Sequence, residues 1–117
     1  MNKEDCLNAF KAMSEGMIEK DPLKLKESMS KDSVLYHMTG RKESREGFIK
    51  DILNGILNYY DYRIDFFELN NDVANVKIHL KAKVYGGSIS WWPLEEEIKF
   101  IIEDNKTKIK ESRVRLG

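Results

Sequence analysis

Residues 37–60 read HMTGRKESREGFIKDILNGILNYY, and this stretch decides the fold of the chain. It starts in a short strand predicted over 34–39 and runs into the first residues of a long strand. Between the two strands, residues 41–43 are expected to form a solvated loop, Ser44 can cap an amphipathic helix and Gly55 can end it. The apolar face of this helix consists of Phe48, Ile49, Ile52 and Leu53. The stretch therefore predicts a strand, a helix and a second strand in succession.

Two further helices are predicted before this stretch. Asn2 can begin the first of them, and its buried stripe recurs at steps of three and four residues: Cys6, Phe10, Met13 and Met17. Asp21 followed by Pro22 ends this helix and begins a second, shorter one, because aspartate caps helix N-termini and proline suits the first helical position. Residues 30–33 are then expected to form a turn.

Long strands are predicted after Tyr60, where apolar and polar residues begin to alternate. On the first strand, Tyr62, Ile64 and Phe66 are expected to share one face, opposite Asp61, Arg63 and Asp65. On the next strand, the expected core face carries Val76, Ile78, Leu80, Ala82 and Val84. Turn-forming residues at 70–72, 86–87 and 104–105 divide the region into about four strands.

This order of elements defines the fold class as α+β. Three N-terminal helices are expected to pack on the concave face of a curved, mostly antiparallel sheet. With 117 residues, the chain suits a single domain over 1–117 that buries its own core.

The composition excludes several classes of partner. The chain has 20 basic and 20 acidic residues, so its formal net charge is zero and we expect neither nucleic-acid binding nor attraction to an anionic membrane. No apolar run has the length of a membrane span or the pattern of a signal peptide, which predicts a cytoplasmic protein. Cys6 is the single cysteine and cannot form an internal disulfide. His37 and His79 lack close ligand spacing, so no metal is expected.

The motif His37-Met38-Thr39-Gly40, followed by a helix and then by Gly55 and Tyr59 in a Gly-x-x-x-Tyr pattern, resembles one group of bacterial proteins. This group is the SnoaL-like, ketosteroid isomerase-like branch of the nuclear transport factor 2-like superfamily. The resemblance covers nearly the whole chain and implies a cone-shaped α+β fold that encloses one pocket. Members include isomerases, dehydratases, cyclases, carriers and non-catalytic dimerisation modules, so the resemblance leaves the activity open.

The resemblance also implies where functional residues lie. The general base of the isomerases lies three positions before a strand-terminal glycine, and that position is His37 here. The oxyanion-binding tyrosine of the first helix is replaced by Met13, which cannot donate a hydrogen bond. The second oxyanion donor falls near Glu97. The usual steroid isomerase constellation is therefore not expected.

His37 is the predicted catalytic residue, because imidazole can take up and return a proton near neutral pH. Tyr59 is predicted to bind the substrate through its hydroxyl group, although packing within a strand is the ordinary role of such a tyrosine. Trp91 and Trp92 precede Pro93, and at least one of them is expected at the pocket mouth or in a subunit interface. Met13 is included as a pocket-lining residue. Residues 95–97, three glutamates, are expected to be solvated.

We expect a pocket for a small apolar or carbonyl-bearing ligand, in a protein that pairs as a homodimer through its outer sheet face. Whether the protein is an enzyme stays open. One interpretation is acid/base chemistry without a cofactor, of the isomerase, dehydratase or cyclase type. The alternatives are a ligand-binding module without chemistry and a protein-interaction or dimerisation module.

Overall fold

The computed structural model describes residues 1–83 and 86–117. Within them, the helices are α1 (Lys3–Glu19), α2 (Pro22–Ser28) and α3 (Arg45–Leu53). The strands are β1 (Met29–Tyr36), β2 (Lys42–Ser44), β3 (Asn58–Asn70), β4 (Val73–Lys83), β5 (Ile89–Glu103) and β6 (Lys106–Leu116).

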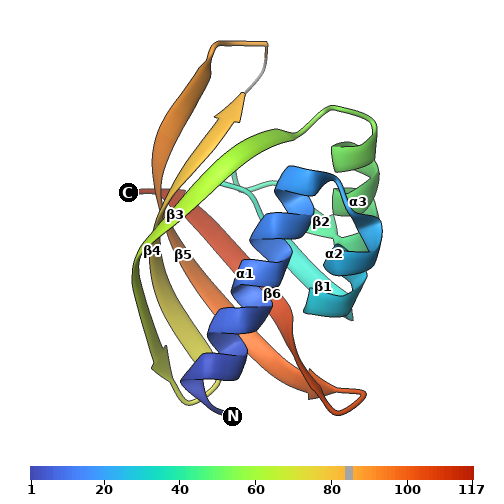
Figure 1. Cartoon of the computed structure of the whole chain (residues 1–117), viewed down its shortest axis with the longest axis vertical. Coiled ribbons are helices and arrows are strands. Elements are labelled where there is room, and N and C mark those ends of the chain that lie inside the picture. The colour runs from blue at the N-terminus through green and yellow to red at the C-terminus, as the bar shows by residue number, and fades with distance from the viewer. Residues whose placement is uncertain (84–85) are drawn as a thin grey trace.

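The strands form one sheet in the order β2-β1-β6-β5-β4-β3. Strands β1 and β6 run parallel, and every other pair is antiparallel. The sheet is strongly curved and the helices lie on its concave side, with α1 crossing in front of the central strands (Figure 1). The predicted α+β architecture, with three helices on a mostly antiparallel sheet, is confirmed.

The helices begin where the sequence predicts. The Asn2 side chain accepts a hydrogen bond from the Asp5 backbone N–H at 2.8 Å, and the Asp21 side chain caps α2 with Pro22 in its first turn. The Ser44 hydroxyl accepts a hydrogen bond from a backbone N–H at the start of α3. Each cap satisfies helix donors that have no partner within the helix. The Ser44 cap fixes where α3 begins.

A bulge in β3 changes which of its aromatic residues enters the core. The pairing with β4 shifts between Ile64 and Phe66, so the alternation of faces is interrupted there. Phe67 is 9 % exposed and packs between Phe10 and Phe100, whereas Phe66 is 43 % exposed. The expectation that Phe66 shares the core face of Ile64 is therefore wrong, because one extra residue reverses the faces.

Replacing Phe67 with alanine is expected to lower the free energy of unfolding by about 3 kcal/mol, as for other buried aromatic residues that leave a cavity. The matched change Phe66→Ala should cost less than about 1 kcal/mol, since this ring lies on the surface with Lys77 as its cationic neighbour. Urea unfolding followed by circular dichroism measures both. Equal losses in the two variants would contradict the bulge.

Two segments predicted as irregular are strands. Residues 30–33 lie within β1, where the Ser30 hydroxyl donates to Glu103 Oε1 at 3.1 Å, so a polar residue is satisfied inside the sheet. The segment 41–43, predicted as a solvated loop, contributes Lys42 and Glu43 to β2, which pairs with β1. Val84, predicted on the core face of β4, lies outside the described residues.

Within the described part of the chain, no helix has both the length and the apolar character needed to cross a bilayer. Over the same residues, no group of three or more histidine, cysteine, aspartate or glutamate side chains is arranged to hold a metal ion.

Candidate functional site

A cavity of about 750 Å³ lies between the concave face of the sheet and the helices. Its volume is in the range that accommodates small organic ligands. Apolar side chains from helices and strands form most of its walls: Met13, Met17, Leu35, Phe48, Ile78, Leu80 and Leu94. A small number of polar groups face this apolar space, and they define what the cavity can do chemically.

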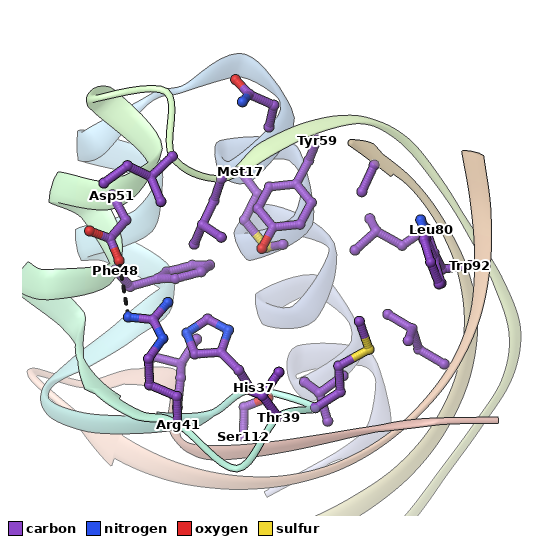
Figure 2. A pocket seen from close by; sticks show the side chains of 18 of the residues that line it. Met17, His37, Thr39, Arg41, Phe48, Asp51, Tyr59, Leu80, Trp92 and Ser112 are labelled. Atoms are coloured by element: carbon purple, nitrogen blue, oxygen red, sulfur yellow. Dashed lines mark hydrogen bonds and ion pairs between the residues drawn. The ribbon is translucent and has the colours of Figure 1, made fainter. Parts of the chain in front are cut away.

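His37 lies immediately after β1 and directs its ring into the cavity (Figure 2). The turn that holds it is closed by two backbone hydrogen bonds, from His37 to Arg41 and from Gly40 to His37. Gly40 has a φ of +87°, a conformation that favours glycine. The His37 side chain is 18 % exposed and packs at 6.0 Å between ring centroids against Phe48. The predicted catalytic residue therefore lines the cavity, while its role stays a prediction.

Glu43 is the partner of His37, and sequence reasoning missed it. Its Oε1 lies 2.7 Å from His37 Nε2, and its side chain is 7 % exposed. Arg41 Nη1 donates to Glu43 Oε2 at 3.3 Å and to Asp51 Oδ2 at 3.4 Å. Burial and the neighbouring Asp51 raise the pKa of Glu43, although His37 and Arg41 act in the opposite direction. His37, Glu43, Arg41 and Asp51 thus form one hydrogen-bonded network.

Glu96 is a second polar side chain of the cavity wall that sequence reasoning missed. It lies on the inner face of β5 between Leu94 and Ile98, and it lines the cavity. The Ser112 hydroxyl donates to its Oε1 at 3.3 Å. Burial raises the pKa of Glu96 to about 7, which the bond from Ser112 only partly offsets. The expectation that all three glutamates of 95–97 are solvated is wrong for Glu96, because alternation turns the middle one inward.

Tyr59 extends from β3 into the cavity, with its hydroxyl on the side of His37 (Figure 2). No described residue forms a hydrogen bond with this hydroxyl. Burial, with smaller contributions from the negative charges of Glu96 and Glu43, raises the pKa of Tyr59. The phenol therefore stays protonated and can donate a hydrogen bond to a ligand.

The two tryptophans lie on opposite faces of β5. Trp92 lines the cavity beside Leu80, its neighbour on β4 (Figure 2). Trp91 lies on the outer face, is 45 % exposed and has Lys81 Nζ 5.9 Å from its ring centroid. The structure does not bring Trp91 to the cavity, since successive strand residues face opposite ways. Met13 lines the cavity from α1, in the position where the resemblance places an oxyanion donor.

No protein-family model matches this sequence, and no curated protein matches it. Solved structures do match it along nearly its whole length. A nuclear transport factor 2-like protein from Cytophaga hutchinsonii is 15 % identical, with 100 % of both chains covered and a TM-score of 0.78. A nuclear transport factor 2-like protein of unknown function in nutrient uptake from Rhodospirillum rubrum is 14 % identical, with 97 % of this chain and 98 % of that chain covered and a TM-score of 0.83.

A hypothetical protein from Catenulispora acidiphila with a ketosteroid isomerase-like fold, in complex with trimethylamine, is 12 % identical. The match covers 93 % of this chain and 85 % of that chain, with a TM-score of 0.72. The chain thus has the nuclear transport factor 2-like fold, which includes ketosteroid isomerase-like proteins. At these identities the likeness establishes the fold, and the activity has to be argued from the site.

Proposed function

We propose that the protein binds a small, mostly apolar carbonyl compound and transfers a proton at the carbon next to the carbonyl group. The observation that carries this proposal is that His37, in the turn after β1, and Glu96, on β5, line one apolar cavity. A proton acceptor and a proton donor in one desolvated space are what such a reaction requires.

In the proposed step, His37 takes a proton from the carbon beside the carbonyl group. The C–H bond breaks, its electron pair forms the carbon–carbon double bond of an enolate, and negative charge moves to the carbonyl oxygen. Protonated Glu96 or the Tyr59 hydroxyl donates a hydrogen bond to that oxygen, and such stabilisation is a large contribution to catalysis. Where the substrate has a double bond between its β and γ carbons, the enolate is a dienolate, and return of the proton to the γ carbon moves the double bond between the α and β carbons and completes an isomerisation without a cofactor.

The second candidate function is ligand binding without chemistry. Met13 favours it, because a thioether stands where the resemblance places a hydrogen-bond donor, and the hydroxyl of Ser14, the next residue of α1 in the cavity wall, donates to the Phe10 carbonyl. The Catenulispora protein, whose structure is a complex with trimethylamine, supports binding of a small organic molecule by a protein of this fold. A binding module would raise its melting temperature with a ligand and would leave the ligand's hydrogens unexchanged.

Hydrogen exchange in D₂O separates the two functions. Cyclohexanone, acetophenone and indanone exchange the hydrogens beside their carbonyl groups slowly without a catalyst, and proton NMR follows the loss of signal. Faster exchange with the protein than with an equal concentration of imidazole buffer supports proton transfer. Stabilisation in a thermal-shift assay without faster exchange supports the binding module.

We also propose that two copies pair through the outer face of the sheet. Large apolar side chains are exposed there in the single chain, including Phe66, Ile89 and Trp91. Sedimentation velocity is expected to give a dimer for the wild type and a monomer for Trp91→Glu, which would replace an apolar ring in the interface with a carboxylate on each copy. Trp92→Phe, a change inside the cavity, should leave the dimer intact. A wild-type protein that sediments as a monomer would contradict this pairing.

A further inference from the structure

The carboxylate behind His37 determines which of its two ring nitrogens is available to a ligand. Glu43 Oε1 lies 2.7 Å from Nε2, a distance typical of a charge-assisted hydrogen bond. No described residue forms a hydrogen bond with Nδ1, the other ring nitrogen. Since His37 lines the cavity, the unpaired Nδ1 is the nitrogen left for a bound molecule.

Two features of the surroundings hold Glu43 as a hydrogen-bond acceptor, although burial and Asp51 raise its pKa. Arg41 Nη1 donates to Oε2, which occupies the second oxygen as an acceptor. Glu43 also lies just before the N-terminus of α3, where the helix dipole stabilises negative charge. Burial and Asp51 act against ionisation and leave the pKa of Glu43 raised on balance, while His37 and Arg41 oppose this rise.

Gly47, which has no side chain, leaves space for the Glu43 carboxylate. A Cβ atom added at Gly47, in the first turn of α3, would lie 3.2 Å from Glu43 Cγ and 3.4 Å from Oε2. A side chain at this position would require Glu43 to shift by a few tenths of an ångström. The position of Glu43 is thus supported by β2, by Arg41 and by the absence of a side chain at Gly47.

We infer that Glu43 is a positioning residue that holds the proton of neutral His37 on Nε2, so that Nδ1 faces the cavity with its lone pair as the proton acceptor. This inference rests on the proposed function for the role of Nδ1 in proton transfer. The assignment of the tautomer does not depend on any substrate and can be tested without one.

The test is long-range ¹H–¹⁵N correlation NMR of the imidazole rings at about pH 8, above the ordinary titration range of histidine. Nitrogens that carry a proton and nitrogens with a lone pair resonate in well-separated regions. The chain has two histidines, and comparison with His37→Ala assigns their signals. In the wild type, His37 is expected to show a protonated Nε2, a lone-pair Nδ1 and an Nε2–H proton that exchanges slowly with water.

In Glu43→Met, which keeps the side-chain length and removes the acceptor, both His37 nitrogens should shift toward the average of the two tautomers. The Nε2–H signal should disappear through exchange with solvent. The signals of His79 should stay unchanged, because this residue lies on the outer face with Asp65 as its partner. The wild-type spectrum carries the test even if the variant fails to fold.

A wild-type His37 with its proton on Nδ1 would overturn the inference, since Glu43 would then be a donor to Nε2. A His37 spectrum in Glu43→Met that matches the wild type would overturn it as well. The expected tautomer together with no catalysed exchange of ketone hydrogens would support the role of Glu43 in positioning and contradict the proposed proton transfer. The failures of the two proposals are therefore distinguishable.

Discussion

Replacing His37 with alanine is expected to reduce protein-catalysed hydrogen exchange beside a ketone carbonyl by about 10²- to 10⁴-fold, the usual range for removal of a general base. Without the imidazole, the cavity still holds Tyr59, whose phenol stays protonated, and Glu96, whose pKa of about 7 leaves it partly protonated at neutral pH. The phenol cannot replace His37 as an acceptor, and only the ionised fraction of Glu96 is left to carry a residual rate. Proton NMR of the ketone in D₂O measures the rate.

The second histidine supplies the matched control for this experiment. His79→Ala removes an imidazole from the outer face of β4, away from the cavity, and should leave the exchange rate unchanged. Ligand-induced stabilisation of His37→Ala in a thermal-shift assay should persist, because the apolar walls that bind the ligand remain. A variant without His37 that exchanges ketone hydrogens as fast as the wild type would exclude His37 as the base.

The sequence identifies His37 but not its partner, for a physical reason. The resemblance of His37-Met38-Thr39-Gly40 to the family motif implies that His37 lies at the edge of a pocket. Glu43 lies in β2, a strand of only three residues, and such a short segment has no periodicity that distinguishes it from a charged loop. Its contact with His37 depends on the pairing of β2 with β1, which is a tertiary property.

Glu96 could have been recognised from alternation alone. Leu94 and Ile98 lie two residues on either side of it and are buried, so the same face of β5 must carry Glu96 inward. A run of three glutamates hides this signal, because like charges in sequence are usually solvated. The bulge that exchanges Phe66 for Phe67 is harder to foresee, since a single extra residue in a strand leaves the composition unchanged.

Replacing Glu96 with glutamine is expected to raise the free energy of unfolding at about pH 9 by about 3 kcal/mol, and to have little effect near pH 4. The pKa of Glu96 is about 7 in the folded protein and about 4.3 in an unfolded chain. Between these values the folded state binds more protons than the unfolded state. Raising the pH through this window therefore destabilises the wild type, whereas glutamine has no proton to lose.

Urea unfolding at a series of pH values measures this difference. The matched control is Glu97→Gln, a change one residue further on the outer face of β5, which should alter stability little at any pH.

The same titration bears on function, because only protonated Glu96 can donate a hydrogen bond to a carbonyl oxygen. Binding of a neutral ketone should thus weaken above about pH 7 in the wild type and not in Glu96→Gln, whose amide keeps a donor at every pH. Parallel pH profiles for the wild type and Glu96→Gln would show that Glu96 is ionised and solvated, and would remove the proton donor from the proposed reaction.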